Sequence, residues 1–487
     1  MSSKTSSIGN DGATKKTEAV SSNSAAAPPE FICDCEESTR SACKGLPYYK
    51  ECEGRRYCVL HYPDKDKGVD FNTALLRKIG LDDFDFRGVW FPSQADFSEF
   101  TFTSDAIFTS AVFAADAYFV SAVFRAAADF ALVTFKTTAY FNGATFGAAD
   151  FSSVTFNAAD FTSTLFGAYA YFISATFEGD ADFTSAIFSA ETSFRSAIFK
   201  AVVLFVNSVF KETAVAYFAA ARFSDAVRFQ NCKFEAPSPL KLDGAIIEKP
   251  ERVMFHTVAL LSRWFINVDP RKMNFTDVSW GKLNKDAIND AIQALREREV
   301  SSPHRLLAIA YRQLSMNAED NNRYSEAANL RQAAMLTHSL EIRHTLCRPL
   351  RKGLPLAARI WMKGREAWQA FDPLHSLYGL ASGYGENAGR AAMVLIVIWL
   401  CFSGVYWLGD VTWQQKVDPR PAKAHALQAP AFTCGGALVY SGQVITLQKP
   451  EPQPANIQGK VVIMLEAVFG PLQAALLALA VRRKFMR

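Results

Sequence analysis

The sequence lacks the motifs on which most enzyme classes depend. It contains no Walker loop, no G-x-S-x-G nucleophile elbow and no H-E-x-x-H helix, and its seven histidines are dispersed. We therefore expect a protein that is not an enzyme. A large excess of charge of one sign is also missing, because 52 Lys and Arg residues balance 48 Asp and Glu residues. Nucleic acid is for that reason not an expected partner.

An apolar signal segment is missing from the start of the chain. Residues 1–30 are mainly Ser, Ala, Thr, Asn, Lys and Gly, which predicts a disordered tail. The part that follows is expected in a reducing cytosol, where clustered cysteines bind metal more often than they form disulfides. A length of 487 residues, 21% of them charged, and a mean hydropathy of +0.02 indicate about three folded domains.

One aromatic residue type dominates the composition, with 40 Phe against 8 Trp and 15 Tyr. Between Phe97 and Phe234, 26 Phe residues recur at steps of five or six, with one slip, and Ala or another small residue precedes most of them by two positions. Such a step fits neither a helix nor a long strand. It predicts a solenoid, whose units bury their apolar faces only against stacked neighbours. In the four-sided coil that we expect, Phe and the small residue point inward and the residue between them faces water.

From Phe86 to Phe234 the chain resembles the pentapeptide-repeat family, which implies a right-handed quadrilateral β-helix. Steps of five often alternate with steps of six, and we expect the extra residue to bulge at a corner. At four units per coil, the ladder gives about six and a half coils, on the order of 30 Å at ~4.8 Å per stacked strand. Residues 237–250 are predicted to form a loop. A second five-residue ladder from Phe255 to Trp280 then predicts a final coil that caps the edge.

The charge along this ladder is lopsided. Between positions 96 and 191 there are eleven acidic residues against Arg125 and Lys136. Some pentapeptide-repeat proteins imitate DNA and bind type II topoisomerases. The resemblance therefore implies that the acidic β-helix acts as a DNA mimic or as a docking surface for a protein. The alternative is that Asp between Ala and Phe is an ordinary solvent-facing residue of the repeat.

Six candidate metal ligands lie just before the ladder. Cys43, Cys52, Cys58 and His61 have a spacing near that of a Cys-Cys-Cys-His finger, and Cys33 and Cys35 precede them. Structural zinc takes four thiolate or imidazole ligands, so two of the six would be spectators. The sequence predicts a zinc-holding cap, and the alternative is a set of reduced cysteines in a loosely folded lead-in.

Helical patterns follow the ladder. Ser302-Pro303 is a helix start signal, and 320–322 predict the turn of a hairpin that resembles a tetratricopeptide-like unit. This hairpin would either dock a partner or pack across the end of the β-helix. A basic segment with two Trp residues, within 346–390, suits an anionic membrane surface.

Two apolar runs, 391–408 and 461–481, are transmembrane candidates, and both have basic outer flanks. The region 436–487 resembles the pore helix and inner helix of two-transmembrane potassium channels. This resemblance makes Thr446, Lys449 and Glu466 pore-like candidates, with a bend at Gly470-Pro471. The sequence departs from those channels after Thr446, where Leu-Gln-Lys-Pro replaces Gly-Tyr-Gly and excludes a potassium-selective filter.

The predicted fold is a mainly β solenoid followed by a helical neck and two transmembrane helices. We expect a multi-pass protein of a bacterial-type inner membrane, with both termini in the cytoplasm and with homo-oligomeric assembly. Its solenoid would serve as an interaction or sensing platform on a channel-like module, and the alternative is a tethered binding protein. The expected segments are 1–30 (tail), 31–80 (cap), 81–282 (β-helix), 283–345 (hairpin), 346–390 (juxtamembrane), 391–408 (span), 409–460 (extracytoplasmic loop), 461–481 (span) and 482–487 (basic tail).

Overall fold

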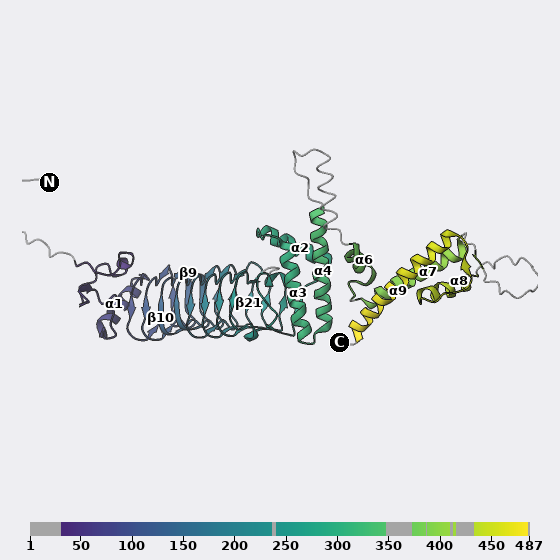
Figure 1. Ribbon diagram of the computed structural model, residues 1–487. Helices are drawn as coiled ribbons and strands as arrows, with labels where there is room; N and C mark the ends of the chain where they lie inside the picture. Colours follow the sequence, from purple (N-terminus) through teal and green to yellow (C-terminus); the bar gives the residue numbers. More distant parts are fainter. Residues whose placement is uncertain are drawn as a thin grey trace, which may run out of the picture.

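The computed structural model describes residues 31–235, 240–346, 373–385, 387–409, 413–414 and 433–485. Figure 1 shows a small cap, a long β-solenoid, a helical neck and a group of helices at the C-terminal end. The cap contains η1 (Glu37–Cys43), the hairpin of β1 (Lys50–Cys52) and β2 (Arg55–Tyr57), and α1 (Gly68–Gly80). The expected tail, residues 1–30, lies outside the described residues.

The solenoid strands form two long parallel sheets, of 15 and 12 strands within the described residues. The first sheet comprises β3 (Trp90–Phe91), β4 (Ala95–Asp96), β7 (Val112–Phe113), β8 (Ala117–Tyr118), β10 (Thr134–Tyr140), β12 (Thr155–Asp160), β15 (Thr176–Phe177), β16 (Ala181–Asp182), β19 (Ile198–Phe199), β20 (Val203–Val206), β23 (Arg222–Phe223), β24 (Val227–Gln230), β27 (Ile246–Ile247), β28 (Val253–His256) and β30 (Asn274–Thr276). The second comprises β5 (Thr101–Phe102), β6 (Ala106–Ile107), β9 (Val123–Asp129), β11 (Thr145–Asp150), β13 (Leu165–Phe166), β14 (Ala170–Tyr171), β17 (Ile187–Phe188), β18 (Thr192–Ser193), β21 (Val209–Phe210), β22 (Ala216–Tyr217), β25 (Lys233–Phe234) and β26 (Leu240–Lys241).

The predicted solenoid is confirmed, with about eight turns. Along most of the rod, Phe residues pair in register with the Phe one coil further on, as Phe91 does with Phe113 and Phe113 with Phe135. The stacked rings lie from 4.3 to 5.4 Å apart between centroids. Because each side of the coil repeats this stacking, four Phe columns fill the interior of the rod.

The alternation of inward and outward residues is also as predicted. In β8 (Ala117–Tyr118), Ala117 is fully buried, Tyr118 is partly exposed and the following Phe119 is fully buried. Most positions two before a ring hold a small side chain such as Ala106 or Ala139, because the Phe columns already fill most of the interior.

The extra residue of a six-residue step does bulge at a corner. The pairing of β10 with β12 matches Phe135 to Phe156 but Thr138 to Ala158, so one additional residue lies between Phe135 and Thr138. A carboxylate often sits at such corners. The side chain of Asp116 accepts a hydrogen bond of 3.2 Å from the backbone N–H of Thr138, one coil away.

A second kind of corner recurs at every other unit and has a left-handed backbone. Ser110, Ser121 and Ser153 occupy it with φ values from 56° to 59°, and Gly143 occupies it with φ 71°. Leu132 adopts the same conformation with φ 62°. Glycine, as at Gly143, avoids the strain that a Cβ causes at positive φ, whereas Ser and Leu132 bear it.

The prediction for residues 237–250 was wrong in part. Instead of one loop, this stretch contains β26 and β27, which continue the two sheets; residues 236–239 lie outside the described part. The final coil is present, since Phe255 stacks on Phe275 at 5.4 Å and β29 (Ala259–Leu260) pairs with β31 (Ser279–Trp280). Two short helical turns, η2 (Pro250–Arg252) and η3 (Ser262–Phe265), complete it.

The neck contains one helix more than the expected hairpin. α2 (Lys285–Glu297) precedes α3 (Pro303–Asp320) and α4 (Tyr324–Leu346), and the start at Pro303 is as predicted. Asn317 of α3 is fully buried, and its amide donates to the carbonyls of Pro270, Arg271 and Met273 at 3.1, 2.9 and 2.7 Å. The hairpin therefore packs across the end of the solenoid.

The C-terminal helices are α6 (Pro373–Ser382), α7 (Ala388–Leu408), α8 (Cys434–Ile445) and α9 (Ile457–Phe485), with the small β32 (Trp413–Gln414) and β33 (Gln453–Pro454) pair beside them. α7 and α9 contain the two predicted spans, and both are long and apolar enough to cross a membrane. Most of the basic juxtamembrane segment, 347–372, lies outside the described residues.

Candidate functional site

The cap gathers a group of metal-ligand side chains. The Sγ atoms of Cys33, Cys35 and Cys43 and a ring nitrogen of His61 all lie within 4.8 Å of one another. Cys33 precedes β1, Cys43 ends η1, and His61 follows β2, so three separate segments of the cap converge here. Three thiolates and one imidazole are a donor set that suits a soft or borderline divalent metal.

Two further predicted ligands differ in their placement. Cys58 is fully buried, and its Sγ lies 3.3 Å from Nδ1 of His61, while its backbone N–H donates to Sγ of Cys33 at 3.3 Å. Cys52 lies at the end of β1, half-buried, and does not belong to the ligand group found among the described residues. The structure thus brings five of the six predicted cap residues together and leaves Cys52 aside.

The hydrogen bond of Nε2 determines which ring nitrogen of His61 is protonated and which one faces the thiols. Nε2 lies 2.8 Å from the carbonyl oxygen of Arg87, and a carbonyl can only accept, so Nε2 carries the proton. Nδ1 is thereby left to face the thiols. Burial lowers the pKa of His61. Hydrogen bonds with Cys33, Cys35 and Cys58 raise this pKa by more than burial lowers it, to about 12.

Hydrogen bonds among the thiols also shift the pKa values of Cys33 and Cys43 in opposite directions. Hydrogen bonds from Cys35, Cys43 and Cys58 lower the pKa of the Cys33 thiol. Hydrogen bonds with Cys33 and Cys35 instead raise the pKa of Cys43, which burial raises as well. Thiol ligands give up their protons when they bind a divalent cation, so metal binding by this group would release protons.

In the C-terminal helices, one carboxyl group joins three elements. Glu466 of α9 is fully buried; the hydroxyl of Tyr406 in α7 donates to its Oε2 at 2.5 Å, and the hydroxyl of Ser441 in α8 donates to its Oε1. The rings of Tyr406 and Tyr440 pack edge to face beside it at 5.1 Å. Glu466 therefore holds the short helix α8 against both long helices.

The other pore-like residues lie around the end of α8. Thr446 is its exposed C-cap, and its hydroxyl bonds back to the carbonyls of Gly442 and Gln443 at 3.0 Å. Lys449 is exposed and lines a pocket of about 830 Å³ between the loop after α8 and α9. Gly470 allows close contact, since a Cβ there would lie 2.7 Å from Cγ1 of Ile445. Pro471 lies inside α9, as expected for a bend.

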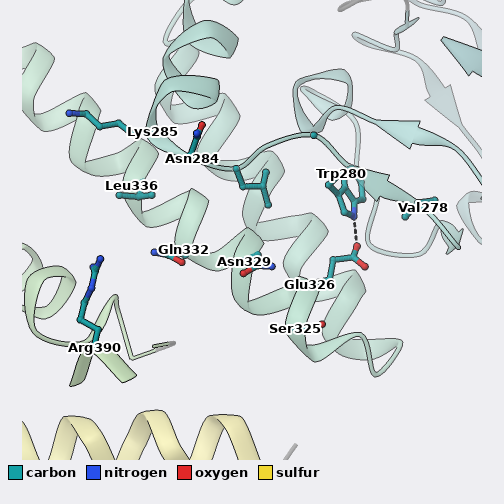
Figure 2. Close-up of a pocket in the computed structure, with 12 residues that line it drawn as sticks. Val278, Trp280, Asn284, Lys285, Ser325, Glu326, Asn329, Gln332, Leu336 and Arg390 are labelled. Carbon is teal, nitrogen blue, oxygen red and sulfur yellow. Dashed lines mark hydrogen bonds between the residues drawn. The ribbon is translucent and has the colours of Figure 1, made fainter. Parts of the chain in front are cut away.

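A groove of about 730 Å³, lined by both polar and apolar side chains, runs along α4 beside the end of the solenoid (Figure 2). Figure 2 shows Asn329 and Gln332 along this helix and Trp280 of the final coil at one end of the groove. The indole N–H of Trp280 donates to the carboxylate of Glu326 on α4. This bond joins the final coil of the solenoid to the neck.

The acidic residues of the solenoid have a structural role that sequence reasoning did not identify. Asp96, Asp129, Asp150, Asp160 and Asp182 each accept a hydrogen bond from a backbone N–H two residues on. Asp105, Asp116 and Asp180 accept one from the next coil. Most of these carboxylates thus build corners while remaining at the surface.

Comparison with known proteins agrees with the repeat. Residues 119–165 match the family model described as pentapeptide repeats (9 copies). No curated protein and no solved structure matches the chain. No family match supports the resemblance of the C-terminal region to potassium channels, which stays a prediction. The chain thus contains a pentapeptide-repeat segment within a β-solenoid of about eight turns, followed by helices, two of which are apolar enough to cross a membrane.

Proposed function

We propose that this is a non-enzymatic integral membrane protein whose cytosolic solenoid is an interaction or sensing platform on a channel-like module. The observation that carries the proposal is the arrangement of α7, α8 and α9 around Glu466. At 12 residues, or about 18 Å, α8 is too short to cross a bilayer core of about 30 Å. A short helix held between two spans by a buried carboxyl group has the arrangement of a re-entrant pore helix.

The module acts as a homo-oligomer in a lipid bilayer, since two spans and one re-entrant helix from a single copy cannot enclose a pore. Lys449, at the loop after α8, sets the selectivity by repelling cations, so the pathway is not potassium-selective. The test is single-channel recording of the full-length protein in a planar bilayer, with a deletion of 388–487 as the control. Lys449→Glu should shift the reversal potential toward cations, and Lys449→Arg should not.

The proposed topology, in a bacterial-type inner membrane with both termini in the cytoplasm, can be tested on the native cysteines. Cys434, at the start of α8, is exposed and would lie on the extracytoplasmic side. A membrane-impermeant maleimide applied to intact cells should modify Cys434 and spare Cys52 until the cells are opened, as read by mass spectrometry. Labelling of Cys52 in intact cells would contradict this topology.

The cap, in this proposal, holds one structural zinc ion. Thiolate and imidazole donors within 4.8 Å of one another suit the closed tetrahedron that zinc takes in structural sites. Purified protein should contain about one zinc per chain by elemental analysis. Cys33→Ser should lose it, whereas Cys52→Ser should retain it.

A second candidate is a membrane-tethered binding protein whose acidic solenoid docks a basic protein or imitates DNA. It is favoured by eleven acidic residues against two basic ones between positions 96 and 191, and these carboxylates stay at the surface although many also build corners. In this case a deletion of 388–487 would leave partner binding intact. Charge reversal at the exposed Glu99 and Glu191 should weaken it.

A further inference from the structure

The N-terminal end of the solenoid is an open edge that, within the described residues, the cap covers. The backbone N–H of Trp90 in the first coil has no coil before it and donates instead to the carbonyl of Leu60 in the cap, at 3.0 Å. The carbonyl of Trp90 accepts from the buried ammonium group of Lys67 at 2.6 Å, and the same group donates to Leu60 at 2.8 Å. The cap therefore pairs edge groups that would otherwise attract another strand.

The metal-ligand group supplies another of these edge contacts. His61 faces the thiols with Nδ1 and donates from Nε2 to the carbonyl of Arg87, which belongs to the first coil. Leu60, the partner of Trp90, lies between Cys58 and His61 in the chain. A metal bound by this group would thus fix the position of the segment that touches the edge.

A further contact comes from the helical turn that carries Cys43. Gly88 of the first coil has φ 64°, and a Cβ there would lie 2.8 Å from Cβ of Thr39 in η1. The turn therefore rests directly on the backbone of the coil. Two of the segments that converge on the metal-ligand group, η1 and the stretch from Cys58 to His61, also converge on the solenoid edge.

We propose that the metal ion of the cap is a latch, which holds the cap on the first coil of the solenoid through His61. This inference rests on the proposed zinc site. With the metal bound, the cap pairs the edge groups of Arg87 and Trp90. When the metal leaves, the segment from Cys58 to His61 loses its anchor, and the edge of the first coil opens to solvent.

Hydrogen–deuterium exchange of the full-length protein in detergent tests the latch at single amides. The amide of Trp90 bonds to the cap, whereas the amide of Phe86 bonds to Ile107 in the second coil at 2.7 Å, so it serves as an internal control. Removing the metal with a chelator should raise the exchange rate at Trp90 by at least about tenfold, the equivalent of one hydrogen bond. The rate at Phe86 should change much less.

Two variants separate metal binding from latching. His61→Cys replaces the imidazole by a fourth thiolate, a ligand set that still holds zinc, but removes the bond to Arg87. Gly88→Ala keeps every ligand and pushes Thr39 away from the coil. Both should retain about one zinc per chain and still raise exchange at Trp90, whereas Cys52→Ser should behave as the unaltered protein in both measurements.

The outcomes distinguish the latch from the zinc site itself. Protein that neither contains nor takes up zinc would contradict the proposed metal site and the latch with it. Protein that contains zinc but shows unchanged exchange at Trp90 after chelation would overturn only the latch. Faster exchange at Trp90 after chelation and in the zinc-loaded His61→Cys variant would establish it.

Discussion

The packing of the Phe columns makes a sharp prediction at Phe151, near the middle of the rod. Its fully buried ring stacks on Phe130 and Phe172 at 5.0 and 4.9 Å. It also meets Phe141 and Phe161 edge to face, both at 5.4 Å. Phe151→Ala should therefore remove both the burial of the ring and its contacts with two neighbouring coils.

The expected loss in the free energy of unfolding is about 5 kcal/mol. Truncation of a buried Phe to Ala typically costs about 3–5 kcal/mol, and aromatic pairs add about 0.5–1.5 kcal/mol each. Phe234 is the matched control, because its ring is partly exposed and stacks on Phe210 near the far end. Phe234→Ala should cost about 2 kcal/mol, less than full burial of the ring would be worth.

Urea denaturation of the detergent-solubilised protein, followed by far-UV circular dichroism, measures both variants. Because each coil touches only its neighbours, Phe151→Ala should also split the transition of the solenoid into two steps. Equal losses at Phe151 and Phe234, or a loss below about 1.5 kcal/mol at Phe151, would refute the view that the columns hold the rod together.

Three further predictions concern single residues. Gly143→Ala should destabilise the solenoid by about 1–2 kcal/mol, since a Cβ at φ 71° would meet Ser121, and Gly244→Ala, in open space, should cost less in the same denaturation assay. Asn317→Ala should cost about 2–4 kcal/mol, because three carbonyls lose their donor, with the loss seen as a lower urea midpoint. Glu466→Leu should lower the thermal midpoint of the C-terminal helices by the equivalent of about 2–3 kcal/mol, whereas Glu466→Gln, which can still bond to two hydroxyls, should cost under about 1 kcal/mol. A leucine variant as stable as the glutamine variant would contradict the bridging role.

The solenoid could be predicted from the sequence because its cause is local and repeated. The Phe period, the small residue before each ring and the extra corner residue each reflect a position within one unit. The helix start at Pro303 is a similarly local signal. By contrast, β26 and β27 were missed because their inward residues are Leu240 and Ile247 rather than Phe.

The candidate sites were predicted less completely because they depend on contacts between distant segments. The spacing in the sequence favours Cys52 as a ligand. In the structure Cys52 lies in the β1–β2 hairpin, outside the metal-ligand group, whereas Cys33 belongs to that group. Glu466 was noted for its charge, and its partners Tyr406 and Ser441, 60 and 25 positions away, gave no signal in the sequence. Lys67 was likewise not singled out, since its role exists only where the cap meets the first coil.

The four-sided coil has a consequence for how such a chain can change in length. One unit forms one side, so removal of a single unit would turn everything downstream by a quarter of a revolution about the rod axis. The final coil and the neck, which are joined through Asn317, would turn together, so the cap and the neck would no longer have the same orientation about the rod axis. Only gains or losses of four units, about 20–22 residues, keep the two ends of the rod in the same rotational alignment. The rod can therefore lengthen by whole coils while the cap and the neck keep their mutual orientation about its axis.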